Sequence, residues 1–274
     1  MGAIVVCLDS LRDFVESGRY YKFGLNTKQL GFLRDKIKAH QSKVGARRME
    51  WAEQGVVGIF EGYRIFEDDM EGLKVFLSEI GLLPILCEVE WSVLSQEEQE
   101  QMKQWMVFQP TLVRFTANKD QKCDNDMLHE YEDKVSKLEI TKLVDLWLSK
   151  KMENDLLVEQ WKTIKHSLNK QLPAPNTYHF DFGTVSCSNS DPLVSGVNLY
   201  KQLGKDIVMK YGQVDMSRLP AYMARGFISK CDLKKFRKVI DIRLKYTLMQ
   251  IVAEQRRREY YQKHIGKLLM QPLN

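Results

Sequence analysis

The chain has 274 residues, of which 44% are hydrophobic and 28% are charged, and its formal net charge is +5. This composition supplies a core of ordinary size and excludes a largely disordered chain. The apolar run "AIVVCL" at residues 3–8 is short and has no basic flank, so we expect neither a membrane span nor a signal peptide.

Charge is unevenly distributed along the chain. Residues 51–133 carry 18 acidic and 6 basic side chains, whereas residues 201–274 carry 17 basic and 6 acidic ones. An acidic middle and a basic C-terminal quarter predict either that the two segments bind each other or that the basic segment binds a polyanion.

The five cysteines are scattered through the sequence and form no CxxC pair. This pattern is typical of reduced thiols and gives no support for a structural zinc site. We therefore expect a cytoplasmic or nuclear protein in a reducing environment.

The first part of the sequence alternates between apparent strands and helices. We expect strands at 3–8, 55–66, 83–91 and 111–117, with helices after residue 9 and near 26–40, 67–82 and 95–106. Ser95 and Glu98 form a predicted capping box for the last of these helices. Such alternation indicates a parallel sheet that is covered by helices.

The rest of the sequence predicts a helical region at about 126–170, a strand at 177–187, a helix at 192–204 and a strand at 206–211. Beyond residue 213 we expect no strand. There the apolar stripe of a long helix is formed by Leu233, Phe236, Ile240, Leu244, Leu248 and Ile251. The sequence thus predicts an α/β domain with a three-layer parallel sheet over 1–212 and a basic helical extension over 213–274.

Acidic residues that follow predicted strands are the first candidates for a catalytic site, because ligands of a parallel sheet collect at the carboxyl ends of its strands. Asp9 follows the first strand and Asp191 follows the strand that ends near residue 186, while Glu139 and Asp145 lie between them in sequence. Together these carboxylates could hold Mg²⁺ or Mn²⁺ and activate water for phosphodiester cleavage, with Asp9, Asp145 and Asp191 as metal ligands.

The order of these motifs resembles the NYN branch of the PIN-like ribonuclease domains. The resemblance covers about residues 3–210 and rests on Asp9, on the acidic pair in "LEITKLVDLWL" and on the serine-rich stretch "SCSNSDPLVSGVNLYKQLGKDIVM". It implies a PIN-like fold and metal-dependent cleavage of RNA. Arg12 stands where the family has an asparagine, and Ser188 and Ser190 stand where it has aspartates. An inactive relative fits these residues as well, so the sequence leaves enzymatic activity undecided.

Helix capping explains the same carboxylates in a structural way. Asp9 and Asp191 both suit an N-cap position, and Ser136 with Glu139 suits a capping box. Glu139 and Asp145 are six residues apart and share no face of a regular helix. They converge only if Glu139 lies at or before the start of the helix.

The basic C-terminal region is the stronger indication of function. Its cations, with tyrosines nearby, suit phosphate neutralisation and base stacking. These cations are Lys234, Lys235, Arg237, Lys238, Lys245, Arg256, Arg257 and Arg258. We therefore predict a protein that binds RNA or another single-stranded nucleic acid. The alternative is a non-enzymatic structural or adaptor protein whose C-terminal helices bind a protein partner or form a homo-oligomer.

Overall fold

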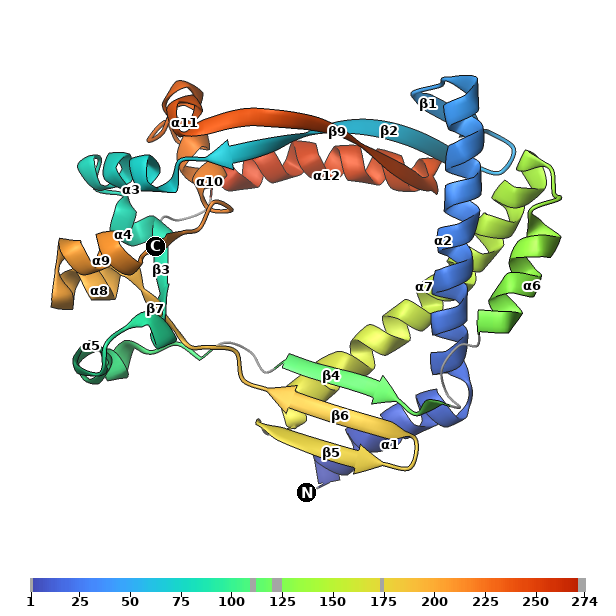
Figure 1. Ribbon diagram of the computed structural model, residues 1–274, viewed down its shortest axis with the longest axis horizontal. Helices are drawn as coiled ribbons and strands as arrows, with labels where there is room; N and C mark the ends of the chain where they lie inside the picture. The colour runs from blue at the N-terminus through green and yellow to red at the C-terminus, as the bar shows by residue number, and fades with distance from the viewer. Residues whose placement is uncertain (1, 109–111, 120–124, 173–174, 271–274) are drawn as a thin grey trace. The chain divides into compact units, whose positions relative to one another are not determined.

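The computed structural model describes residues 2–108, 112–119, 125–172 and 175–270 (Figure 1). These residues form twelve α-helices, two short 3-10 helices and three sheets of three strands each. Within the described residues all strand pairing is antiparallel. The expected parallel three-layer sheet is therefore wrong, and with it the PIN-like fold.

The chain divides into two compact units, each assembled from three separate segments. Unit 1 comprises residues 1–61, 110–189 and 245–254, and unit 2 comprises residues 62–109, 190–244 and 255–274. The boundary expected near residue 212 separates two domains that would each fold independently. The two compact units are defined by contacts within the folded chain and do not test independent folding, so this boundary stays a prediction.

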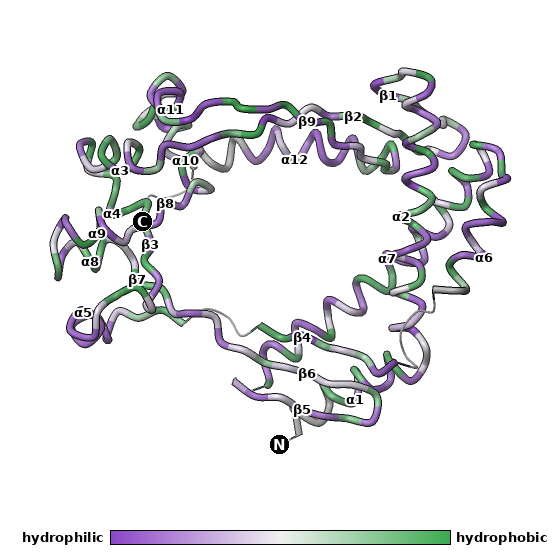
Figure 2. The backbone as a smooth tube through the Cα atoms, viewed as in Figure 1, coloured by the Kyte–Doolittle hydropathy of each residue, from purple (hydrophilic) through white to green (hydrophobic). Residues whose placement is uncertain are grey.

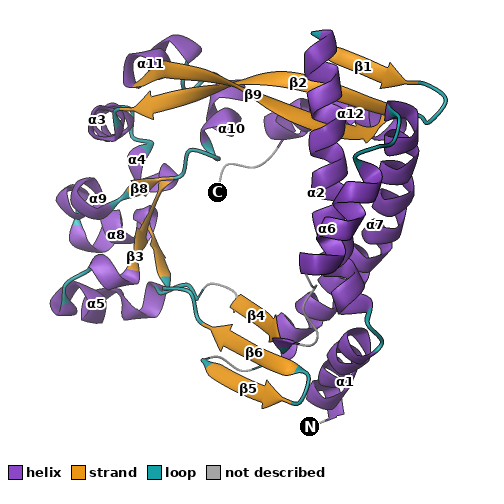
Figure 3. Cartoon of the chain, turned by 45° about the vertical axis from the view of Figure 1, so that its right-hand side comes forward, coloured by secondary structure: helices purple, strands orange, loops and turns teal. Residues whose placement is uncertain are grey.

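The helical part of unit 1 contains α1 (Gly2–Glu16), α2 (Arg19–Val44), α6 (Asn125–Val135) and α7 (Ile140–Gln171). The two long helices α2 and α7 lie side by side over much of their length (Figure 3). Gly18 separates α1 from α2 and has φ of 74°, a left-handed conformation that glycine adopts without steric cost. The helix expected at 26–40 is confirmed and is longer than predicted, and the helical region expected at 126–170 consists of the two helices α6 and α7 with a break at residues 136–139.

The strand expected at residues 3–8 is instead the first half of α1. Cys7, Leu11, Phe14 and Val15 are all buried, and their spacing of three and four residues places them on one face of a helix. The β-branched residues of "AIVVCL" favour a strand locally, but this helical periodicity decides the structure.

A polar cluster with the buried Asn26 at its centre lies between α2 and α7. Asn26 is fully buried; its side-chain amide donates to Glu153 Oε2 at 2.9 Å, and Lys150 Nζ donates to Asn26 Oδ1 at 3.2 Å. Lys22 forms an ion pair with Glu153. Hydrogen bonds from Lys22 and then Asn26 lower the pKa of Glu153 below its ordinary value. Such a cluster fixes the register of two helices, since sliding one along the other would leave these groups unpaired.

The sheet of unit 1 that positions the candidate site has the strand order β4 (Leu112–Ala117), β6 (Gly183–Ser188), β5 (Asn176–Phe180). One face of it packs against α1 and α7 through Val113, Phe115, Val185 and Cys187. The strand expected at 111–117 is confirmed for 112–117, and residue 111 lies outside the described residues. The single strand expected at 177–187 is a hairpin, because the chain turns at residues 181–182.

At the other end of α2 and α7, β1 (Arg48–Trp51) pairs with the first residues of β2 (Val56–Asp68), with Arg48 opposite Ile59 and Trp51 opposite Val56. Trp51 and Val56 join a buried cluster with Leu33, Ile37, Val144 and Trp147. The third strand of this sheet is β9 (Arg237–Gln250), which continues directly into α12 (Ile251–Met270). The strand predicted at 55–66 is confirmed.

Unit 2 packs short helices around a small sheet with the order β7 (Leu193–Ser195), β3 (Cys87–Glu90), β8 (Gln213–Val214). Its helices are α3 (Met70–Glu79), α4 (Leu83–Leu86), α5 (Gln96–Met102), α8 (Gly196–Leu203), α9 (Lys205–Tyr211), α10 (Leu219–Ala224) and α11 (Lys230–Phe236), and its 3-10 helices are η1 (Trp91–Val93) and η2 (Lys103–Trp105). The capping box of Ser95 and Glu98 is confirmed. The expected strand at 206–211 is the helix α9.

The helix expected over residues 233–251 is also wrong, because β9 occupies most of this range. Hydrophobic and hydrophilic residues alternate along β9 (Figure 2). Ile242 and Tyr246 lie two residues from Ile240 and Leu244, so all four share one face of a strand. On a helix, Ile242 and Tyr246 would lie opposite the apolar stripe, which explains why the strand forms instead.

Candidate functional site

The four carboxylates predicted as a catalytic site are divided between the two units. Asp9 is exposed on α1, and Asp145 is exposed on α7. Glu139 is the N-cap residue of α7 and its side chain makes no capping hydrogen bond. Asp191 belongs to unit 2, where it precedes β7 and accepts a hydrogen bond from Ser92 Oγ at 3.4 Å.

The separation of Asp9 from Asp145 follows from the packing of unit 1. The neighbours of Asp9 on α1, Cys7 and Leu11, share a core cluster with Leu168 near the C-terminal end of α7. Leu168 is 23 residues beyond Asp145 on the same helix, about 35 Å along its axis at a rise of 1.5 Å per residue. Among the described residues, no three His, Cys, Asp or Glu side chains form a group that could hold a metal ion.

The basic C-terminal residues do not form one helical face. Lys234 and Lys235 lie on α11, Arg237, Lys238 and Lys245 lie on β9, and Arg256, Arg257 and Arg258 lie on α12. Some already have acidic partners: Arg237 pairs with Asp68 at 3.0 Å, and Lys235 pairs with Asp232 at 3.2 Å. Their predicted role in nucleic-acid binding stays a prediction.

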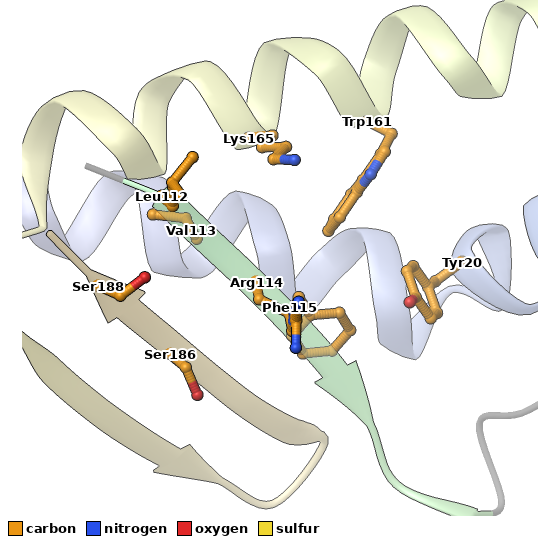
Figure 4. Close-up of a pocket in the computed structure, with 9 residues that line it drawn as sticks. All are labelled: Tyr20, Leu112, Val113, Arg114, Phe115, Trp161, Lys165, Ser186 and Ser188. Carbon is orange, nitrogen blue, oxygen red and sulfur yellow. The ribbon is translucent and has the colours of Figure 1, made fainter. Parts of the chain in front are cut away.

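A different group of residues lines an open pocket of about 590 Å³ in unit 1 (Figure 4). We call it the aromatic–basic pocket. It lies between the N-terminal end of α2, the second half of α7 and the strands β4 and β6. Its lining residues are Tyr20, Leu112, Val113, Arg114, Phe115, Trp161, Lys165, Ser186 and Ser188.

Three aromatic rings form one wall of this pocket. The ring centroids of Tyr20 and Phe115 are 5.0 Å apart in an edge-to-face arrangement, and those of Tyr20 and Trp161 are 5.4 Å apart. Behind them, Phe14 stacks on Trp161 with an interplanar angle of 23°. These contacts hold the rings rigidly, since aromatic pairs prefer such offset and edge-on geometries. Burial raises the pKa of the Tyr20 phenol, which keeps it uncharged.

Two cations stand beside the aromatic wall. Trp161 and Lys165 are one helical turn apart on α7, and Figure 4 shows both side chains extending from the helix toward β4. Arg114 projects from β4. Neither Lys165 nor Arg114 forms an ion pair with a carboxylate of the described residues, so both positive charges are available to a ligand.

The pocket continues onto the open face of the β4–β6–β5 sheet. Arg114 on β4 and Thr177 on β5 both lie opposite Ser186 on β6. Residues opposite each other in antiparallel strands share a face, so these three side chains form a polar row. A second row contains Thr184, whose hydroxyl lies 3.3 Å from His179 Nδ1. The face thus carries hydroxyl groups with an arginine and a histidine, and it is open to solvent.

The sequence patterns did not identify this pocket as a site. Its local signals were the alternation in "TLVRFTA" and "TVSCS", which places Arg114, Ser186 and Ser188 away from the buried face, and the spacing of four between Trp161 and Lys165. No sequence signal brings Tyr20 to β4, because that contact depends on the tertiary packing of α2.

No family model, curated protein or solved structure matches the chain. Among the described helices, none has both the length and the apolar character needed to cross a membrane. Cys7, Cys87, Cys187 and Cys231, the described cysteines, form no disulfide bond.

Proposed function

We propose that the protein binds single-stranded nucleic acid, RNA in particular, through the aromatic–basic pocket of unit 1. The observation that carries this proposal is the combination of three aromatic rings and two cations on one open pocket. Its volume lies in the range of about 300–1,000 Å³ that is usual for ligand sites. Aromatic rings that accept bases, next to cations that neutralise phosphates, are the usual means of holding a single strand.

Each part of the pocket has a chemical role in this proposal. A base enters the pocket and contacts Trp161 and Tyr20, which gives a stacking interaction of about 1–3 kcal/mol. Lys165 and Arg114 neutralise the flanking phosphates. On the open face of the sheet, the hydroxyls of Ser186 and Ser188 bind the ribose 2′-hydroxyl, a group that distinguishes RNA from DNA.

The proposal concerns binding and contains no cleavage step. Metal-dependent cleavage needs carboxylates that converge on one ion, and Asp9 and Asp145 are far apart within unit 1. The polar rows on the open face of the β4–β6–β5 sheet extend the path of the bound RNA beyond the pocket. A reducing cellular location, cytoplasmic or nuclear, is part of the same proposal and is supported by the described cysteines, which form no disulfide.

Fluorescence anisotropy with a labelled single-stranded RNA and the full chain tests the proposal. Lys165→Ala removes a pocket cation, and Lys162→Ala is the matched control because Lys162 lies one turn earlier on α7 and already pairs with Glu159 at 2.8 Å. We expect Lys165→Ala to weaken binding several-fold and Lys162→Ala to leave it nearly unchanged. Absence of binding by the unaltered protein, or equal losses for both variants, contradicts the proposal.

A base-free control separates stacking from charge. An oligomer with the same number of phosphates but no bases keeps the contacts to Lys165 and Arg114 and loses the contact to the aromatic wall. We expect it to bind at least about tenfold more weakly than RNA, as follows from one stacked base. Equal affinity for the two oligomers would mean that the rings have no part in binding.

A further inference from the structure

The strand β9 forms an edge of its sheet within the described residues, where the order is β1–β2–β9. All residues from Lys238 to Lys245 are exposed. An exposed edge strand presents unpaired N–H and C=O groups that can pair with another strand. The stretch of β9 from Ile240 to Leu244 belongs wholly to unit 2, and we call this stretch the β9 edge.

The backbone at the centre of the β9 edge is directed outward. The N–H of Ile242 donates to the side chain of its own neighbour, Asp241 Oδ1, at 2.7 Å. A backbone N–H that is bound to an exposed side chain takes no part in the ladder with β2. In an antiparallel strand the N–H and C=O of one residue point to the same side, so both backbone groups of Ile242 face away from β2.

The side chains of the β9 edge are sorted by face. On one face Ile240, Ile242 and Leu244 are exposed by 60%, 64% and 68%. On the other face Asp241 and Arg243 form an ion pair with each other at 2.9 Å, and both are well exposed to solvent. A row of three large apolar side chains at this exposure indicates an interaction surface.

We propose that the β9 edge pairs with the β9 edge of a second copy of the chain, in an antiparallel arrangement centred on Ile242. In this register Ile242 meets Ile242 of the second copy, and Ile240 meets Leu244. Asp241 of each copy then meets Arg243 of the other, so two ion pairs form across the interface. The N–H and C=O of Ile242 are already directed outward, and in the new ladder the N–H donates to the C=O of Ile242 in the second copy in place of Asp241 Oδ1.

The sequence of the β9 edge favours a second copy over an unrelated partner. "IDIRL" is self-complementary in charge and in apolar character when read in opposite directions, as a two-fold interface requires. Centring the pairing on Asp241 or Arg243 would place like charges opposite each other, and so would a parallel arrangement in register. Like charges directly opposite in a sheet are destabilising, so the register centred on Ile242 is favoured.

Charge reversal tests this register because the two positions are exposed and tolerate substitution. Asp241→Arg and Arg243→Asp each place two pairs of like charges in the homodimer, and we expect each to weaken dimerisation at least about tenfold. The double variant, with both residues exchanged, restores opposite charges and should recover dimerisation. A mixture of the two single variants should form a heterodimer, because the two arginines at these positions of one chain then meet the two aspartates of the other.

Sedimentation velocity on the full chain, from about 1 μM to about 200 μM, measures these outcomes. We expect the unaltered chain to show a concentration-dependent dimer and each single variant to remain a monomer. Circular dichroism of each single variant verifies that its fold is intact. A monomeric unaltered chain at all concentrations, single variants that dimerise normally, or a mixture of single variants that stays monomeric would each overturn the proposal. RNA binding is measured in a separate assay. Because no residue of the β9 edge lines the aromatic–basic pocket, failure of one proposal is distinguishable from failure of the other.

Discussion

The salt dependence of RNA binding provides the most quantitative prediction for the aromatic–basic pocket. Replacing Lys165 and Arg114 together by alanine removes the two cations that we place beside the phosphates. For a single strand, each neutralised phosphate contributes about 0.7 to the slope of log affinity against log salt concentration. A fourfold rise in salt therefore weakens binding about 2.6-fold for each cation and about sevenfold for both.

The assay is a titration of labelled RNA followed by anisotropy, repeated at about 50, 100 and 200 mM salt, where this electrostatic contribution is large. We expect the slope of the double variant to be smaller than that of the unaltered protein by about 1.4. Lys162→Ala serves as the control for the loss of a lysine from α7 and should keep the full slope. Identical slopes for the double variant and the unaltered protein would refute our placement of the phosphates.

The remaining predictions concern stability and reactivity. Glu153→Gln should destabilise the protein at neutral pH. The hydrogen bonds that lower the pKa of Glu153 contribute stability above about pH 4.3, the unfolded value, and this contribution is lost as the pH falls through the lower folded value. A difference in urea unfolding between the two proteins that does not shrink as the pH falls below about 4.3 would contradict this. Gly196→Ala should destabilise unit 2 by about 1–3 kcal/mol, because a Cβ there would lie 2.6 Å and 2.8 Å from two backbone carbonyl oxygens. Gly31→Ala inside α2 places a Cβ that meets no atom within 4 Å, so it should stabilise the protein by up to about 1 kcal/mol. Thermal unfolding of both variants measures these changes. Cys231 is exposed and should react with a thiol reagent at about pH 8 long before Cys87. Cys87 is buried, and desolvation raises its pKa to about 11. Mass spectrometry of the labelled peptides measures the order, and faster labelling of Cys87 would contradict this prediction.

Local sequence patterns predicted several elements correctly where the local signals agreed with one another. The capping box of Ser95 and Glu98 fixed the start of α5, and the helix expected near 67–82 contains α3. In these places helix periodicity, capping and propensity all agreed. The hairpin of β5 and β6 was predicted as a single strand because the turn at residues 181–182 follows an aromatic stretch without a strong turn signal.

Elsewhere two periodicities competed and the sequence alone favoured the wrong one. In β9 the spacing of Ile240, Leu244 and Leu248 fits a helix, while Ile242 and Tyr246 fit only a strand. In α1 the β-branched residues suggested a strand, whereas Cys7 and Leu11 fit a helix. The error in α1 contributed to the alternation from which a parallel sheet was inferred, whereas the error in β9 produced the expected helical extension.

The candidate site was missed through the same errors. Asp9 was placed at the end of a strand, whereas it lies within the helix α1. The aromatic–basic pocket instead needs α2, α7 and β4 to meet, and it brings Tyr20 into contact with Phe115, which is far away in the sequence. Such long-range contacts carry no local pattern, so the pocket could be found only in three dimensions.

Photo-crosslinking tests the central claim most directly. An RNA oligomer that carries iodouracil in place of uracil is bound to the full chain and irradiated, and the modified peptides are identified by mass spectrometry. Our account predicts crosslinks at Tyr20, Phe115 or Trp161, because a base in the pocket contacts these rings. Crosslinks confined to other aromatic residues, such as Tyr260 and Tyr261 of α12, would contradict it.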